Sequence, residues 1–176
     1  ALSDRLTATV GARITQEKIE GAGAGRHIFD NGIVGYNNVG GLGLASGSNK
    51  IDDTQLTGNL ALAYETGTGT AYVSVANSYK SAGFNGEVQN NAAHFSDEGL
   101  FDAETVTAYE AGFKAKPSAH FVWNAALFWQ DYDSPQARIF VNFPLPGGGS
   151  ITSNSLSNLD AATVYGLDAD FSWQAT

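Results

Sequence analysis

The chain has no cysteine and few charges for its length. Its 176 residues include no methionine either, and 15% are charged, against about 25% in ordinary soluble domains. The missing cysteine excludes a disulfide framework and thiol chemistry. No run of about 18 apolar residues occurs, which excludes a transmembrane helix. The nine basic residues are scattered and the net charge is -9, so we expect no nucleic-acid partner.

Patterns for catalysis and metal binding are also missing. The three histidines lie in separate predicted connections, and no G-x-S-x-G nucleophile motif occurs. The glycine-rich run at 21–25 is not followed by the Lys-Ser/Thr pair of a phosphate-binding loop. Asp131 and Asp133 do not follow the calcium-loop pattern. We therefore expect neither an enzyme nor a bound cofactor or metal ion.

What the chain does contain is a series of strand-like segments of about ten residues. We predict six strands, at 6–15, 55–65, 71–80, 105–115, 121–130 and 163–174. Short connections at 66–70 and 116–120 alternate with long ones at 16–54, 81–104 and 131–162. Outer-membrane β-barrels alternate in this way, with tight turns on one side and long loops on the other.

Each segment alternates apolar and polar residues with period two, as strands do. In segment 121–130, for example, Trp123, Leu127 and Trp129 share the apolar parity, whereas Asn124 and Gln130 lie on the other. The charged residues of the six segments all fall on the polar parity, namely Arg13, Glu65, Lys80, Glu110, Lys114, Asp168 and Asp170. A bilayer enforces such sorting, but a soluble sandwich with a buried apolar face gives the same alternation.

Aromatic residues on the apolar parity gather near the ends of the segments. Tyr64, Phe121, Phe171 and Trp173 lie toward the short turns or the chain end, and Tyr79 and Trp129 lie toward the long connections. Two aromatic girdles around an apolar band are typical of membrane barrels, although aromatic residues also fill sandwich cores.

Five stretches, taken together, resemble the barrel of TonB-dependent outer-membrane receptors. They are LTATVGARITQEK at 6–18, YVSVANSYKSAGFN at 72–85, FDAETVTAYEAGFK at 101–114, NAALFWQDYDSPQ at 124–136 and VYGLDAD at 164–170. Each is similar to one motif of that family, and together they occur in the family's order. Two departures are small: Ala82 replaces a usual glycine, and Ala103 stands where a proline often precedes the glutamate.

The resemblance implies an all-β fold, an antiparallel up-and-down transmembrane β-barrel. Six strands would be a segment of a barrel with about 22 strands. The motif residues are Tyr79, Gly83, Phe84, Asn85, Glu104, Tyr109, Glu110 and Gly112. Residues 1–176 form one partial barrel domain in this interpretation, with no plug domain, TonB box or signal peptide, and the missing initiator methionine suggests an internal piece.

The implied function is uptake of a scarce nutrient, most often a ferric siderophore, across the outer membrane of a Gram-negative bacterium. Expected partners are outer-membrane lipid, the remaining strands and plug of the parent chain, the TonB system acting through that plug, and a small-molecule metal chelate. The seven charged residues named above are expected to face the lumen, contacting the ligand or the plug. His94 lies in the connection where haem receptors carry a ligating histidine, so haem is an alternative ligand.

A second interpretation is a small autonomous outer-membrane barrel with a structural or adhesive role. Eight strands can close a barrel, and the two additional strands would have to lie at 32–39 and 137–143. Segment 137–143 is alternatively an extension of the fifth strand or a hairpin within a loop. The ordered family motifs favour the receptor.

Overall fold

The computed structural model describes residues 4–25, 27–28, 34–35, 45–85, 100–144 and 150–175. Within these residues the regular structure consists of strands, and no helix is long and apolar enough to cross a membrane.

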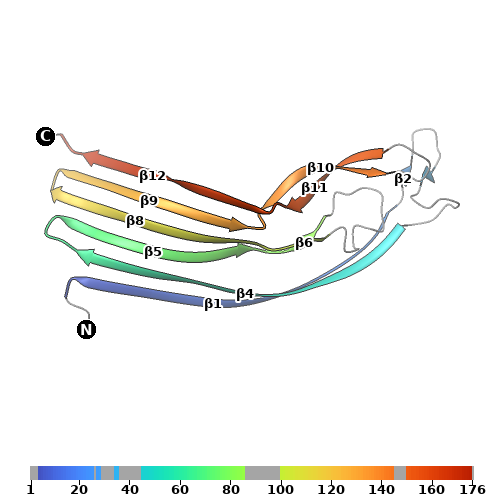
Figure 1. The fold of residues 1–176 in the computed structure, drawn as a ribbon, viewed down its shortest axis with the longest axis horizontal. Coiled ribbons are helices and arrows are strands. Elements are labelled where there is room, and N and C mark those ends of the chain that lie inside the picture. Colours follow the sequence, from blue (N-terminus) through green and yellow to red (C-terminus); the bar gives the residue numbers. More distant parts are fainter. Residues whose placement is uncertain are drawn as a thin grey trace.

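Six strands form one antiparallel sheet in the order β1-β4-β5-β8-β9-β12 (Figure 1). They are β1 (Leu6–Gly25), β4 (Ala45–Glu65), β5 (Gly69–Lys80), β8 (Glu104–Ser118), β9 (Phe121–Asp133) and β12 (Ala161–Trp173). The six predicted strands are confirmed: each predicted segment lies within one strand of the sheet, except that residue 174 falls one position beyond the end of β12. Consecutive sheet strands are neighbours, which is the up-and-down arrangement that the loop pattern predicts.

The short connections are tight turns at one end of the sheet, on the left of Figure 1. Between β4 and β5, the amide and hydroxyl of Thr66 both donate to the Gly69 carbonyl at 2.8 Å. Between β8 and β9, a register shift lies between Ala115 and Ser118. The first and last sheet strands also have their outer termini at this end, so the long connections all leave from the other end.

The strand register aligns the apolar positions in rows across all six strands. One row runs Val10, Leu60, Val75, Tyr109, Trp129 and Tyr165. The next row toward the turns runs Ala8, Leu62, Val73, Ala111, Leu127 and Leu167. This apolar face is open, with Val10 77% exposed and Leu127 63% exposed. The sheet therefore has no core of its own, and its apolar side chains need an external apolar environment.

Aromatic residues border the apolar face at both ends. Trp129 and Tyr165 stack with ring centroids 5.2 Å apart at the loop end, and Phe113 packs against Trp123 at 5.6 Å at the turn end. Eight residues separate Phe121 from Trp129, which is about 26 Å along a strand and about 20 Å along the axis of a barrel with a tilt of about 40°. The spacing suits an apolar band about 25 Å tall.

Two long connections contain more regular structure than the sequence predicts. In connection 16–54, β1 and β4 continue as a two-stranded ribbon from Thr15–Gln55 out to Gly25–Ala45, and they lead to two short strands, β2 (His27–Ile28) and β3 (Val34–Gly35). The expectation of a loop beginning at residue 16 was wrong for this ribbon. Backbone pairing continues there because the two strands already lie in register.

In connection 131–162, β10 (Gln136–Pro144) pairs with β11 (Ser150–Asn158). Segment 137–143 is thus a strand of a loop hairpin and does not extend β9. A further small pair joins β6 (Gly83–Phe84) to β7 (Leu100–Phe101). Among the described residues, neither additional strand of the eight-stranded alternative joins the main sheet.

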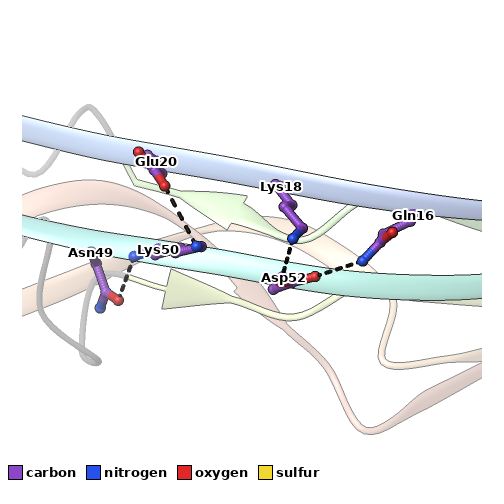
Figure 2. Close-up of polar contacts among 6 residues, drawn as sticks. All are labelled: Gln16, Lys18, Glu20, Asn49, Lys50 and Asp52. Atoms are coloured by element: carbon purple, nitrogen blue, oxygen red, sulfur yellow. Dashed lines mark hydrogen bonds and ion pairs between the residues drawn. The ribbon is translucent and has the colours of Figure 1, made fainter.

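The ribbon shows where the apolar face ends. Ile14 pairs with Leu56 on that face, and the next positions outward on the same face are Gln16, Lys18 and Glu20. Figure 2 shows these side chains meeting their neighbours on β4. The Lys18 ammonium lies 3.4 Å from the Asp52 carboxylate, and the Lys50 ammonium 3.5 Å from Glu20. Exposed pairs of this kind add little stability, but their abrupt start beyond Ile14 marks the border of the apolar band.

Replacing Val73 with arginine should test which face meets lipid. Val73 lies in the middle row of the apolar face, where an arginine against hydrocarbon costs about 2–4 kcal/mol. We expect Val73→Arg to lower the folded fraction of the full-length protein in lipid vesicles, followed across a urea series. The control Ser74→Arg changes the adjacent residue on the opposite face and should cost less. Equal losses in both variants would contradict a lipid-facing apolar side.

Candidate functional site

The polar face of the sheet carries a group of charged side chains near the turn end. Register places Glu110 and Lys114 on β8, and Asp168 and Asp170 on β12, with β9 between them. Glu65 lies at the turn end of β4, in the row of Lys114. Five of the seven charged residues predicted from sequence are therefore brought to one half of this face.

Tyr72 connects two members of this group. Its hydroxyl donates a 2.7 Å hydrogen bond to the Glu110 carboxylate, and the Lys114 ammonium lies over its ring, 5.2 Å from the centroid. A cation over an aromatic face is attracted by the ring quadrupole. Tyr72 therefore contacts both the Glu110 carboxylate and the Lys114 ammonium. The sequence did not predict this role, because Tyr72 differs little from other tyrosines in strands.

Asn124 on β9 contacts an acid on the neighbouring strand β12, Asp170. Its side-chain amide donates to both carboxylate oxygens of Asp170, at 2.9 and 3.1 Å. Asp168 lies one row farther from the turns, opposite Ala126. In these rows of β8, β9 and β12, the carboxylates Glu110, Asp168 and Asp170 outnumber the single ammonium of Lys114. This part of the polar face is thus suited to a cationic group.

Two aromatic rings lie flat against this wall because glycine is their cross-strand neighbour. Tyr72 is paired with Gly112, and Phe128 with Gly166. A Cβ built on Gly112 would lie 2.6 Å from the Tyr72 hydroxyl, and one on Gly166 would lie 2.7 Å from the Phe128 ring. Side chains at these glycines would push the rings away from the sheet. The motif glycine Gly112 is therefore explained by the ring that covers it.

The remaining two charged residues lie toward the loop end. Arg13 pairs with Thr57, and Lys80 stands opposite Glu104 in the last pair between β5 and β8. The structure does not bring either of them to the acidic group.

The motif residues Asn85 and Glu104 make contacts at the loop end of the sheet. The Asn85 amide exchanges two hydrogen bonds with the backbone of Leu156, and the Glu104 carboxylate accepts one from the Gln136 amide N–H at 2.7 Å. Gln136 and Asn158 also bond the backbone there. The sequence did not predict these contacts of Gln136 and Asn158, because asparagine and glutamine are common residues in loops.

The other motif residues have packing positions. Tyr79 and Tyr109 lie on the apolar face, Tyr109 beside Trp129. Gly83 pairs with Phe101, and Phe84 with Leu100, in the short β6–β7 ladder. A Cβ on Gly83 would collide with the Phe101 ring, so this motif glycine also accommodates an aromatic neighbour.

The histidines and loop acids do not form a further site in the part of the chain that is described. His94 lies outside the described residues. Its role in haem binding therefore stays a prediction. Asp131 accepts hydrogen bonds from the Trp129 indole at 2.7 Å and the Thr163 hydroxyl at 3.2 Å. Asp52 is paired with Lys18. These contacts account for both acids as structural partners.

The family model "TonB dependent receptor-like, beta-barrel" matches residues 1–176, the whole chain. The chain belongs to this family. The resemblance inferred from five ordered motifs is thereby confirmed. Barrels of TonB-dependent receptors lie in the outer membrane. In such a barrel the apolar face would be lipid-facing and the polar face would be lumen-facing. No curated protein matches the chain in sequence.

Two solved structures share the fold of this TonB-dependent receptor segment. The ferric yersiniabactin uptake receptor FyuA from Yersinia pestis superposes with a TM-score of 0.70 at 22% identity, over 99% of this chain and 22% of its own. The Serratia marcescens hemophore receptor HasR, solved with its hemophore HasA and heme, gives 0.59 at 15% identity, over 97% of this chain and 30% of its own. The chain thus spans less than a third of either receptor.

The ring over Gly112 gives a prediction for stability. Gly112→Ala places a methyl group against the Tyr72 ring, so we expect the full-length receptor to lose about 1–3 kcal/mol of unfolding free energy. In a Tyr72→Ala background the same substitution should cost little, because the obstructing ring is gone. Gly67→Ala is the control, since a Cβ there would meet nothing within 4 Å. Equal losses of unfolding free energy from Gly112→Ala with and without Tyr72, measured by urea unfolding, would contradict a steric contact with the ring.

Proposed function

We propose that this chain forms part of the wall of an outer-membrane receptor that imports a scarce nutrient, with a ferric siderophore as its ligand. The observation that carries the proposal is the match of the family model over all 176 residues. The similarity to FyuA, named as a ferric yersiniabactin uptake receptor, supports the choice of ligand class. No residue of the segment has a catalytic role in this proposal.

The segment supplies three surfaces to the receptor. Its lipid-facing rows contact the outer membrane, its loop-end hairpins contribute to the extracellular vestibule, and its lumen-facing side contacts the plug of the parent chain. Energy would reach the ligand through a plug that the TonB system engages. The free outer edges of β1 and β12 in the described sheet support a larger barrel, because backbone groups left unpaired at an edge cannot face lipid.

The acidic group on the lumen face is proposed to hold the plug. Glu110, Asp168 and Asp170 leave a surplus of negative charge beside the flat Tyr72 and Phe128 rings. In the confined lumen, arginine or lysine side chains of the plug would form charge-assisted hydrogen bonds with these carboxylates. Glu65 and Lys114 border this contact, whereas Arg13 and Lys80 are proposed to contact ligand or plug nearer the vestibule.

Transport assays test the receptor function. A strain lacking the full-length receptor gene should lose TonB-dependent uptake of iron-55 supplied as ferric yersiniabactin, ferric enterobactin or ferrichrome, and the cloned gene should restore uptake of at least one. Haemin and cyanocobalamin are included in the same panel. Restoration of cyanocobalamin uptake alone would contradict the ferric siderophore proposal, and no restoration by any compound would contradict a receptor of this class.

Haem is the second candidate ligand, favoured by the similarity to HasR, which was solved with heme. If the receptor imports haemin, His94→Ala should weaken haemin binding at least about tenfold, as expected when an axial ligand is lost. His120→Ala is the control, because His120 lies in the β8–β9 turn at the opposite end of the sheet. Unchanged haemin binding in His94→Ala, measured by the haem absorption spectrum, would contradict His94 as the haem ligand.

Neutralising the acidic group should loosen the plug. We expect the full-length double variant Glu110→Gln/Asp168→Asn to increase outer-membrane permeability several-fold, because each buried charge pair at such an interface contributes about 2–5 kcal/mol when one partner is truncated. The measurement is sensitivity of cells to vancomycin, which intact outer membranes exclude. Glu20→Gln, on the exposed ribbon, is the control. Wild-type resistance in the double variant would contradict plug contact at these residues.

A further inference from the structure

The few buried residues of this open sheet point to the base of the β10–β11 hairpin. In the described part of the chain, the buried residues are Ala115, Asn85 and Ser155. Two of these three are polar, and both lie where β10 and β11 leave the sheet. Asn85 is only 6% exposed. Burial of an amide side chain is costly unless its donor and acceptor are both satisfied, so its partners are informative.

Asn85 joins two segments that are 71 positions apart in sequence. Its Nδ2 donates to the Leu156 carbonyl at 2.7 Å, and its Oδ1 accepts from the Leu156 amide N–H at 2.7 Å. A primary amide thus bonds both backbone groups of one residue of β11. This arrangement reproduces the hydrogen-bonded pair of an antiparallel ladder, with a side chain in place of the second strand.

Asn158 makes a second reciprocal contact of the same kind. Its Oδ1 accepts from the Asp102 amide N–H at 2.8 Å, and its Nδ2 donates to the Asp102 carbonyl at 3.0 Å. The same Nδ2 lies 2.8 Å from the Ser134 carbonyl. The end of β11 is therefore bound to the segment before β8 and to the corner between β9 and β10.

Gln136 completes the junction from the start of β10. Its Nε2 donates to the Ser81 and Asp102 carbonyls, both at 2.9 Å, while its backbone N–H donates to Glu104. The β5–β8 ladder ends at this level, with Lys80 opposite Glu104 as its last pair, and the two segments pair again farther out in the short β6–β7 ladder. Side-chain amides thus add hydrogen bonds where the six-stranded sheet ends.

From these contacts we propose that Asn85, Asn158 and Gln136 lock the β10–β11 hairpin onto the sheet as a fixed part of the extracellular wall, so that the hairpin does not act as a moving lid. Asn85 is the buried centre of this lock. The functional meaning rests on the proposed receptor role, in which the hairpin borders the vestibule. The hairpin leaves the loop end of the sheet at an angle (Figure 1), and it presents Phe140, 79% exposed, at a fixed place.

Hydrogen exchange on the full-length receptor in detergent tests the lock without any ligand. In the wild type, we expect the backbone amides of β10 and β11 to be protected together with the main sheet. Asn85→Ala removes two hydrogen bonds and should speed exchange in residues 136–144 and 150–158 by about tenfold or more. Exchange in residues 121–130 should remain at the wild-type rate, which separates local release from general loss of stability.

Asn77→Ala is the matched control. Asn77 makes the same two-bond contact with another strand, accepting from the Gly58 amide N–H at 2.8 Å and donating to the Leu56 carbonyl at 3.0 Å. It does not touch the hairpin, so its loss should leave hairpin exchange unchanged. Asn158→Ala should reproduce the effect of Asn85→Ala and serves as the second variant if Asn85→Ala does not fold.

Two results would overturn the lock. One is fast exchange of the hairpin amides in the folded wild type, and the other is wild-type exchange of the hairpin in folded Asn85→Ala or Asn158→Ala. Because the assay contains no siderophore, its result is independent of the transport assays. A receptor that imports none of the tested chelates could still show the lock, and an importing receptor could fail to show it.

Discussion

Satisfaction of backbone hydrogen bonds is the constraint on which this structure depends. In hydrocarbon an unpaired N–H or C=O costs several kcal/mol, so a membrane wall must pair every strand along its lipid-exposed length. Between the free outer edges of β1 and β12, the described sheet pairs its neighbouring strands from the turn end, and the β4–β5 ladder ends at Gly58–Asn77. Where ladders end, side-chain amides take over: Asn77 bonds β4 where the ribbon separates from β5, and Asn85 bonds β11 beyond the end of β8.

The same strand pairing gives the two faces of the sheet different side chains. Register aligns Val75, Tyr109 and Trp129 on the apolar face, which is proposed to meet lipid. It brings the acids of β8 and β12 together on the polar face, which is proposed to line the lumen. Glycines opposite Tyr72 and Phe128 leave room for both rings against the sheet. Outside the apolar band the faces lose this contrast, and Lys18 can occupy the same parity as Ile14.

The strand bodies could be predicted from sequence because apolar and polar residues alternate with period two, as Leu127 and Trp129 do with Gln130. The β1–β4 ribbon beyond Ile14 was missed, since nothing outside hydrocarbon enforces that alternation. The acidic group was predicted residue by residue, but its link through Tyr72 depends on a hydroxyl contact between strands. The lock was hidden for a different reason: Asn85 was recognised as a motif residue, yet its partner Leu156 is 71 positions away, and no local pattern connects them.

The proposed receptor role depends on one physical property: this sheet must separate lipid from an aqueous lumen. These 176 residues contain no cysteine, so in a full-length receptor that is cysteine-free elsewhere, single nitroxide labels can be placed at each position from 122 to 133 of β9 and studied in vesicles. Electron paramagnetic resonance would then measure collisions with oxygen and with a water-soluble nickel chelate. We predict period-two alternation, with oxygen favoured at 123, 125, 127 and 129 and the nickel chelate gaining at 131 and 133. Equal access of the nickel chelate to both parities at 123–129 would contradict a membrane wall.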